Sequence, residues 1–309
     1  LDDVGPDFGP CALTIGNFDG VHIGHRHVFR RVVDVARENG WRASALTFHP
    51  HPAKVVAPDR APKLLSTPEE RCEWIREQGL DQVLILPFTP EFSGLSPEEF
   101  CRGILARRLR ARCILIGWNF RFGRGQAGDT EYLKRVGPEL GFTTDVMEGV
   151  RLRGRVVSSS EVRRLLAAGN VCLANRFLGR AFSLYGAVVP GQGIGRKKTV
   201  PTLNLRAEAE ALPATGVYIT RTEDLEGGVS WPSITNIGYR PTFRGENLTV
   251  ETHLLRPLEA ETPRRLRVSF LRRLREERQF PGAESLKAQI LRDIARANAY
   301  FRRVGKWVE

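Results

Sequence analysis

The stretch Leu13–His25 reads LTIGNFDGVHIGH and decides the fold of the first half of the chain. Its apolar run, Leu13–Ile15, predicts a short buried strand that ends at Gly16. A turn follows, and the apolar residues beyond it recur at helical spacing until Asn39-Gly40, a common pair at a helix C-terminus. A strand, a glycine break and a helix in this order are typical of the first unit of an α/β fold that binds nucleotides.

Two histidines, His22 and His25, form an H-x-G-H arrangement where this helix is expected to begin. Residues three apart share one face of a helix, so both imidazoles can approach the same anion. Gly24 between them is expected to let a phosphate approach the backbone, and a helix N-terminus favours negative charge. Histidines at this spacing are more often ordinary core or surface residues, so the surrounding strand and turn carry the prediction of a phosphate site.

The composition favours a globular protein of two domains. The chain has 309 residues, of which 41% are hydrophobic and 27% are charged, and this length is enough for two cores. Neither a signal peptide nor an apolar run of membrane-spanning length is evident, which predicts a cytoplasmic protein without a membrane partner. The cysteines are scattered and form no CxxC pair, which favours reduced thiols over a zinc site: Cys11, Cys72, Cys101, Cys113 and Cys172.

The net charge of +12 suits a partner that is rich in phosphate. Nucleic acid and nucleotide substrates are both candidates, and an arginine-rich proteome explains the charge equally well. The charge alone therefore does not choose between these explanations.

Helices and strands alternate through the rest of the first half. Helices are expected to begin at Thr67–Glu70 and Ser96–Glu99, where a capping residue, a proline and a glutamate follow one another. The first of these helices is expected to run to Gly79, and His49–Pro52 predicts a loop. Further buried strands are predicted at Ala43–Phe48, Val83–Leu86, Cys113–Ile116 and Thr143–Met147. This alternation predicts a parallel sheet that is covered on both faces.

Two more segments of the first half are candidates for phosphate or ring binding. The loop Gly117–Gly125 is rich in glycine and arginine and follows a predicted strand. It can equally be an ordinary connection whose two phenylalanines pack in the core. Val157–Arg163 places three serines at a helix start, with Arg163 one turn further on. A simple serine cap explains this pattern, and a triphosphate site explains it as well.

The second half changes to strand-type alternation after a short helix that Asn175–Arg180 closes. No long helix separates its predicted strands, so we expect an antiparallel barrel or sandwich. A terminal helix over Ala283–Arg303 is expected to keep one face apolar through Leu286, Ile290, Ile294, Ala297 and Phe301. The predicted strands are Ser183–Val189, Gly216–Ile219, Ser233–Ile237, Thr249–Leu255 and Leu266–Phe270.

Three stretches of the second half can carry chemistry. Gly191–Arg196 is a glycine-rich loop without the lysine and hydroxyl residue of a Walker loop. Pro201–Asn204 offers a hydroxyl and an amide oxygen to a hard cation such as Mg²⁺. Glu251 shares a strand face with Thr249 and His253, although a solvated carboxylate is the more common role for such a residue.

The motifs of the first half resemble those of the adenylyltransferase module of bacterial bifunctional riboflavin kinase/FAD synthetase, in the same order: GNFDGVHIGH, FHPHP, IGWNFRFG and SSSEVR. The second half resembles the riboflavin kinase module of that family. It has the glycine-arginine loop, P-T-x-N, G-V-Y, N-I-G-x-R-P-T-F, a V-E-x-H strand, and R-x-E-x-x-F at Arg275, Glu277 and Phe280.

The resemblance implies an α/β protein with two domains. Residues 1–180 are expected to form a Rossmann-like nucleotidylyltransferase domain with a parallel sheet, the FMN adenylyltransferase. Residues 181–309 are expected to form an antiparallel β-barrel riboflavin kinase domain with a terminal helix. The implied activity is ATP-dependent phosphorylation of riboflavin to FMN, followed by adenylyl transfer from ATP to FMN, which gives FAD and pyrophosphate.

The resemblance also assigns roles to residues. Glu251, His22 and His25 are implied as catalytic, with Glu251 as the general base of the kinase. The ATP site of the adenylyltransferase is implied to contain Gly16, Asn17, Phe18, His22, His25, Ser159 and Arg163, and its FMN site Asn119 and Arg121. The kinase is implied to bind ATP through Gly193, Gly195, Arg196, Thr202 and Asn204, Mg²⁺ through Thr202 and Asn204, and the flavin through Arg275.

The implied small-molecule partners are riboflavin, FMN and ATP, with Mg²⁺ as cofactor, no nucleic acid and no membrane, in a monomer or weak homo-oligomer. Four departures from the family pattern occur: Lys198-Thr199-Val200 in place of Leu-Gly-Phe, Asn119 where aspartate is common, Ser160 for threonine, and Arg256-Pro257-Leu258 for an aspartate and Tyr-Gly.

Three alternatives remain open at this point. One is an FAD synthetase with an impaired kinase module, which Lys198–Val200 makes credible. Another is an H-x-G-H nucleotidylyltransferase that acts on another acceptor. The third is a basic protein that binds nucleic acid through Arg264–Arg278. Apolar residues interleave with those arginines, which favours a structural element with a solvated face.

Overall fold

The computed structural model describes residue 5 and residues 8–190, 202–242, 245–258 and 261–305. The chain divides into two compact units, Leu1–Ser159 and Ser160–Glu309. The boundary between these compact units need not coincide with a functional domain boundary, so the boundary at residue 180 stays a prediction.

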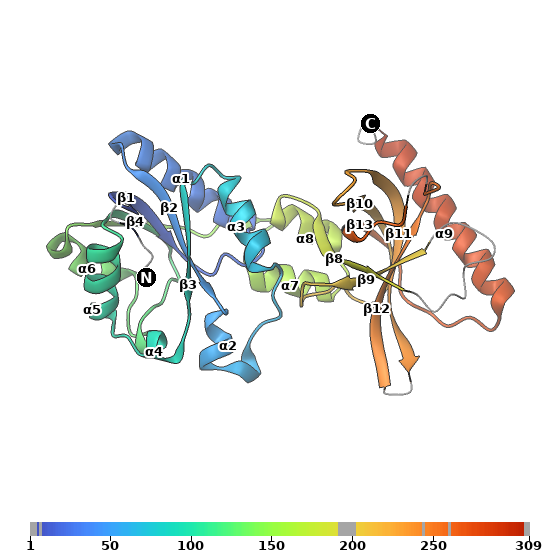
Figure 1. Ribbon diagram of the computed structural model, residues 1–309, viewed down its shortest axis with the longest axis horizontal. Helices are drawn as coiled ribbons and strands as arrows, with labels where there is room; N and C mark the ends of the chain where they lie inside the picture. Colours follow the sequence, from blue (N-terminus) through green and yellow to red (C-terminus); the bar gives the residue numbers. More distant parts are fainter. Residues whose placement is uncertain (1–4, 6–7, 191–201, 243–244, 259–260, 306–309) are drawn as a thin grey trace. The chain divides into compact units, whose positions relative to one another are not determined.

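The first unit is built on a parallel sheet with the strand order β3-β2-β1-β4-β5 (Figure 1). The chain lays down β1, β2 and β3 in one direction and then returns to place β4 on the other side of β1. The point between β1 and β4 is therefore a topological switch point, where ligands bind at the carboxyl ends of the strands. The predicted strands are confirmed, with the bounds β1 Cys11–Ile15, β2 Arg42–His49, β3 Gln82–Pro87, β4 Ala111–Gly117 and β5 Thr143–Met147.

Helix α1 (Ile23–Asn39) covers one face of this sheet and packs on β1, β2 and β4. It ends as predicted at Gly40, which adopts the left-handed conformation (φ 67°) and donates its N–H to carbonyls of the last turn. Strand alternation turns the small side chains of Ala12 and Thr14 toward α1, which lets the helix approach the sheet closely.

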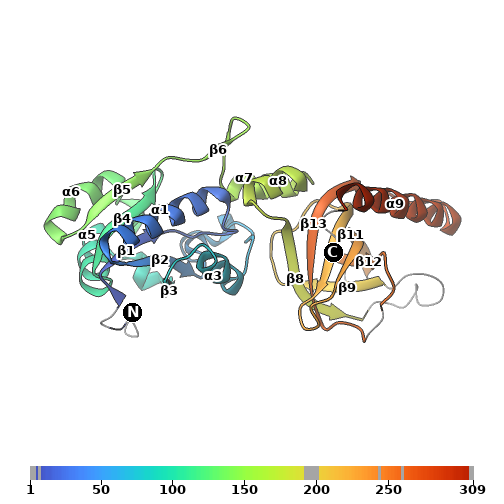
Figure 2. The same ribbon diagram turned by 90° about the horizontal axis from the view of Figure 1, so that it is seen from above.

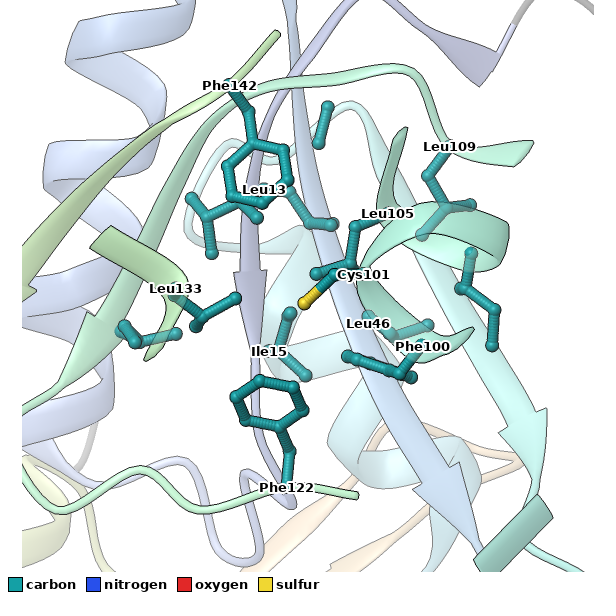
Figure 3. Packing of buried hydrophobic residues seen from close by; sticks show 14 of the residues in the cluster. Leu13, Ile15, Leu46, Phe100, Cys101, Leu105, Leu109, Phe122, Leu133 and Phe142 are labelled. Carbon is teal, nitrogen blue, oxygen red and sulfur yellow. The ribbon is translucent and has the colours of Figure 1, made fainter. Parts of the chain in front are cut away.

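The opposite face of the sheet carries the large apolar core shown in Figure 3. Leu13 and Ile15 of β1 belong to the same cluster as Cys101 and Leu105, which lie on the π-helical segment η3 (Phe100–Arg108). Both faces of the sheet are thus covered, as predicted.

The remaining elements of the first unit are short. Both predicted capping boxes are present, at Thr67/Glu70 and Ser96/Glu99. Helix α3 ends at Arg76 and not at Gly79, since the chain turns over residues 77–79. The bounds are α2 Pro52–Val56, η2 Pro58–Arg60, α3 Pro68–Arg76, α4 Pro90–Ser93, α5 Pro97–Glu99, η4 Arg124–Gln126, α6 Thr130–Leu140, β6 Arg151–Leu152 and β7 Arg155–Val156.

The loop predicted at His49–Pro52 is only partly a loop. His49 is the last residue of β2, and Pro52 is the first residue of α2. The side chain of His51 caps α2 by accepting the backbone N–H of Ala53, so this histidine takes the place of the usual serine or aspartate.

The second unit contains a closed antiparallel barrel with the strand order β10-β11-β12-β9-β8-β13. This result decides between the barrel and the sandwich. Strand β9 contains Thr202, Leu203 and Asn204 of the Pro201–Asn204 motif. The sequence did not predict this strand, because only Leu203 and Leu205 mark its inward face. The bounds are α7 Ser159–Ala167, α8 Val171–Leu178, β8 Phe182–Val189, β9 Thr202–Ala207, β10 Gly216–Asp224, β11 Ser230–Thr242, β12 Gly245–Leu254, β13 Arg265–Arg275 and α9 Ala283–Val304.

Helix α9 runs along the outside of the barrel in both views (Figures 1 and 2). Its second half packs apolar residues such as Ala297 on the barrel, as predicted. The first half does not, because Leu286 and Ile290 are 41% and 40% exposed. The buried positions there are Gln289 and Asp293.

A polar contact replaces the expected apolar one in that first half. Arg275 Nε donates to Asp293 Oδ2 at 2.8 Å, and Gln289 Nε2 donates to Asp293 Oδ1 at 2.8 Å. Arg278 also hydrogen bonds to Gln289. Arg275 at the end of β13 and Arg278 just after it therefore pair with polar residues of the helix.

The arginine-rich segment 264–278 is largely strand β13, with Leu266, Val268 and Phe270 fully buried in the barrel. The prediction of a structural element is confirmed. Among the described residues, no helix combines the length and the hydropathy that a membrane span requires.

We expect Asp293→Ala to loosen the first half of α9, because the Arg275 guanidinium then loses its charged partner in a half-buried position. Amide hydrogen exchange of peptides that cover α9 should accelerate on the order of 30-fold, which corresponds to about 2 kcal/mol of local stability. Arg296→Ala on the exposed side of the same helix is the matched control. Equal exchange in both variants would contradict the anchoring role of Asp293.

Candidate active sites

The turn after β1 is strained and rigidly held. Phe18 and Val21 adopt left-handed backbone conformations (φ 47° and 37°), which are rare for such residues. The N–H of Val21 donates to the carbonyl of Phe18 at 3.0 Å, and both side chains are buried. Strain of this kind persists only where the surrounding structure determines it, and it is concentrated at functional sites.

The two histidines lie together, as the motif predicts. His22 caps α1 by accepting the N–H of His25 on its Nδ1 at 3.2 Å, and the two imidazole rings stack with centroids 3.6 Å apart. Because Nδ1 of His22 is an acceptor, the neutral ring carries its proton on Nε2.

Gly24 lies against the ring of His22. A Cβ at this position would lie 3.1 Å from Cε1 and Nδ1 of His22. The absence of a side chain therefore makes room for the His22 ring, and the approach of a phosphate to this backbone stays a prediction. Gly16 acts similarly, since a Cβ there would lie 2.9 Å from the ring of Phe18.

His51 lies beside the amide of Asn17. Its Nδ1 accepts the N–H of Ala53 at 3.2 Å, and its Nε2 lies 3.2 Å from Nδ2 of Asn17. The two contacts hold the side chains of Asn17 and His51 next to each other.

Two buried charged residues, Asp19 and Arg71, stabilise the same turn. The carboxylate of Asp19 accepts the N–H groups of Leu65 and Ser66 at 3.0 and 3.2 Å. Arg71 donates to the carbonyl of Asn17 at 2.6 Å. Burial lowers the pKa of the Arg71 guanidinium, and the charge of Asp19 opposes that shift.

Sequence reasoning missed Asp19 and Arg71 as residues of the site. A signal exists for Arg71, because it lies on the same face of α3 as the buried Trp74 and Ile75. An arginine among buried apolar residues needs a polar partner. For Asp19 the signal is weaker, because aspartate is common in turns.

Ser159, the last residue of the first unit, also contacts the turn. The hydroxyl of Ser159 donates to the backbone carbonyl of Asp19 at 2.8 Å. Arg163 lies one turn further along α7 and is half-buried.

The loop after β4 places the predicted FMN residues differently from each other. Asn119 is exposed and lies two residues beyond the carboxyl end of β4, the strand that pairs with β1. Arg121 forms an ion pair with Asp129 at 2.8 Å. Phe122 is buried in the core and Phe120 packs against it, so the alternative of two core phenylalanines describes this part of the loop.

The second candidate site lies on the outer face of the barrel. Glu251 of β12 is in register with Asn204 of β9 on one side and with Asn236 of β11 on the other. The predicted alternation is confirmed: Val250, Thr252 and Leu254 are buried, whereas Thr249, Glu251 and His253 are only partly buried. The structure thus aligns three polar side-chain positions across three strands.

Thr202 and His253 form the next cross-strand pair. Thr202 Oγ1 lies 3.4 Å from His253 Nδ1, and burial lowers the pKa of His253. Asn204 is two residues from Thr202 on the same side of β9. A hydroxyl and an amide oxygen side by side suit Mg²⁺, which prefers oxygen ligands and retains water and phosphate ligands. No cluster of three or more histidine, cysteine or acidic side chains fit for a metal occurs in the described part of the chain.

Two further features near Glu251 were not assigned from the sequence. Asn236 belongs to the quoted N-I-G-x-R-P-T-F motif and is the cross-strand partner of Glu251. The carboxylate of Glu277 occupies the space where a Cβ of residue 238 would lie. A second carboxylate therefore lies beside Gly238.

The other residues predicted for the kinase site either have partners within the protein or lie outside the described part of the chain. The guanidinium of Arg275 is bonded to Asp293 and lies 5.6 Å from the ring centroid of Phe280. The predicted ATP residues Gly193, Gly195 and Arg196, like Lys198–Val200, lie outside the described residues.

A strained histidine turn at a sheet switch point, followed by a barrel with a polar strand face, defines a two-module enzyme of the nucleotide-dependent transferase class. The FAD synthetase family matches residues 6–161, and the riboflavin kinase family matches residues 178–301. The chain belongs to the bifunctional riboflavin kinase/FMN adenylyltransferase family.

Relatives of that name match along nearly the whole chain. The protein of Pseudomonas fluorescens is 38% identical over 97% of this chain and 96% of its own length. The protein of Escherichia coli K12 is 35% identical over 94% of this chain and 93% of its own length. A crystal structure described as a macrolide-efflux protein from Streptococcus pneumoniae is similar, with a TM-score of 0.83, 25% identity and 94% coverage of each chain.

We expect Arg71→Met to lower the free energy of unfolding by about 3 kcal/mol, because it leaves buried Asp19 without its countercharge and the Asn17 carbonyl without its donor. Arg76→Met on the exposed face of α3 should change it by less than about 0.5 kcal/mol. Urea unfolding of both variants measures the difference. Equal stabilities would show that Arg71 does not hold the turn.

Proposed function

We propose that this chain synthesises flavin cofactors in two ATP-dependent steps, one in each module. It phosphorylates riboflavin to FMN and then transfers the adenylyl group of a second ATP to FMN, which gives FAD and pyrophosphate. The observation that carries this proposal is the pair of family matches in one chain, each on the module that bears the corresponding polar site.

In the kinase, we assign Glu251 as the general base. It accepts the proton of the riboflavin 5′-hydroxyl while that oxygen attacks the γ-phosphorus of ATP and ADP leaves. Thr202 and Asn204 would hold Mg²⁺ beside the phosphates, and the ion neutralises phosphate charge when bound. Gly193, Gly195 and Arg196 are assigned to ATP binding from the family resemblance alone.

Arg275 is assigned to the flavin side of the kinase. Its bond to Asp293 supports an indirect role, in which it fixes the segment that carries Glu277 and Phe280. The segment then presents these side chains toward the outer barrel face.

In the adenylyltransferase, the FMN phosphate attacks the α-phosphorus of ATP and pyrophosphate leaves. We assign no protein nucleophile. His22 and His25 stabilise the charge that develops on the phosphates, and Ser159 and Arg163 bind the triphosphate.

The turn and the β4 loop would orient the two substrates of that transfer. Gly16, Asn17 and Phe18 shape the ATP site, with the amide of Asn17 held beside His51. Asn119 and Arg121 are assigned to FMN. The ion pair of Arg121 with Asp129 must open if its guanidinium is to reach the FMN phosphate.

The alternatives have less support. Thr202, Asn204 and Glu251 are all retained on one face, which argues against an impaired kinase. A nucleic-acid partner is not proposed, because arginines of β13 are engaged in ion pairs with acidic side chains of the protein: Arg265–Glu208, Arg267–Glu223, Arg273–Glu276 and Arg275–Asp293.

The cellular context is also a proposal. Four buried cysteines are free thiols, which supports a reducing compartment such as the cytoplasm. We propose a monomer or a weak homo-oligomer, with domains over residues 1–180 and 181–309.

Incubation of the purified protein with riboflavin, ATP and Mg²⁺ should yield FMN first and FAD later, because the product of the barrel is the acceptor of the sheet module. Chromatographic separation of the flavins measures both products. Excess EDTA should abolish FMN formation. Recovery of unchanged riboflavin with Mg²⁺ present would refute the proposed kinase, and accumulation of FMN without FAD would refute the adenylyltransferase.

The two sites should fail independently. We expect His22→Ala to lower FAD formation from supplied FMN by about 100-fold or more and to leave FMN formation intact. Glu251→Gln should lower FMN formation by about 100-fold or more while FAD formation from FMN survives. Each variant is the control for the other, and loss of both activities in one folded variant would contradict separate sites.

A further inference from the structure

Thr249 stands two residues before Glu251 on the outer face of β12. Its Oγ1 lies 3.2 Å from Oε1 of Glu251 and 3.2 Å from the carbonyl oxygen of Gly238 on the neighbouring strand. Thr249 and Gly238 are direct cross-strand partners, so the sheet itself holds the hydroxyl between these two acceptors.

A hydroxyl has one proton and two lone pairs. Thr249 can therefore donate fully to only one of these two oxygens at a time. A charged carboxylate is the stronger acceptor, since charge-assisted hydrogen bonds are about twice as strong as neutral ones. The hydroxyl of Thr249 therefore donates its hydrogen bond to Glu251 while Glu251 is ionised.

The preference of the Thr249 hydroxyl between its two acceptors changes when Glu251 takes up a proton during catalysis. A neutral carboxyl group accepts more weakly than a carboxylate, and the amide carbonyl of Gly238 is then a competitive acceptor. The Thr249 hydroxyl can rotate toward Gly238 without moving the backbone, and neither state leaves its proton without an acceptor.

We propose that Thr249 is a positioning residue of the kinase reaction, an inference that rests on the proposed role of Glu251 as the base. The hydroxyl of Thr249 holds Oε1 of Glu251 before the reaction and thereby orients the carboxylate that accepts the substrate proton. It turns to the Gly238 carbonyl after Glu251 has been protonated.

The step balances in atoms and electrons. The O–H bond of riboflavin breaks and its proton moves to the carboxylate of Glu251. The electron pair left on the riboflavin oxygen forms the bond to the γ-phosphorus. The bond between that phosphorus and the oxygen of the β-phosphate breaks, and ADP leaves with its electron pair. Thr249 keeps its own proton throughout and changes only the acceptor.

Thr249→Val keeps the shape and removes the hydroxyl, whereas Thr249→Ser keeps the hydroxyl. With enzyme in excess over riboflavin, we expect Thr249→Val to form FMN about 3- to 10-fold more slowly than wild type, the range of one net hydrogen bond. Thr249→Ser should restore the rate to within twofold. The KM for riboflavin and ATP should stay within twofold, because Thr249 acts through Glu251 and contacts neither substrate.

The control is Ser230→Ala, which removes another hydroxyl of the same barrel, one that accepts from Arg221. It should leave the rate of FMN formation unchanged. FAD formation from supplied FMN and the urea unfolding midpoint should match wild type in all three variants. Thr249→Ala replaces Thr249→Val if the valine variant does not fold.

A Thr249→Val rate equal to wild type, or a Thr249→Ser rate as slow as that of valine, would overturn the inference. So would an equal loss in FAD formation, which would indicate a general folding defect. Absence of FMN formation by the wild-type protein is a separate result, because it refutes the proposed kinase itself.

Discussion

The pairing of β1 with β4 is the contact on which the first module depends. It places the turn that follows Ile15 beside the loop that follows Gly117, although a hundred residues separate them in the chain. Because the strands are parallel, both loops emerge at the same edge of the sheet. In the proposed adenylyltransferase, this edge brings histidines from one loop and the amide of Asn119 from the other to one substrate, although the two loops are distant in the sequence.

The strained backbone of that turn is stable only because other parts of the fold hold it. Phe18 and Val21 are buried, so their side chains stabilise a conformation that their backbones disfavour. The carboxylate of Asp19 accepts a backbone N–H from Leu65, and the guanidinium of Arg71 donates to the backbone carbonyl of Asn17. A local conformation with an intrinsic cost is therefore stabilised by burial and by long-range hydrogen bonds.

The features that could be predicted from the sequence are those that depend on local periodicity. The strand at Leu13–Ile15, the capping boxes and the outward face of Glu251 follow from spacing alone. Features that depend on distant partners could not be predicted. Gln289 and Asp293 are buried only because arginines at the end of β13 reach them, and nothing in the pattern of the helix indicates that partner.

The different chemistry of the two nucleophiles explains why the two modules use different residues. The FMN phosphate has its second pKa at about 6, so it is already ionised at neutral pH and needs no base. The riboflavin hydroxyl is neutral at that pH and must lose its proton as it attacks. A carboxylate is consequently required at the barrel face, where Glu251 stands. At the sheet site Asp19 has its oxygens turned to the backbone of Leu65 and Ser66. In the proposed mechanism the first module thus uses Asp19 to hold the turn, and the second uses Glu251 to accept a proton.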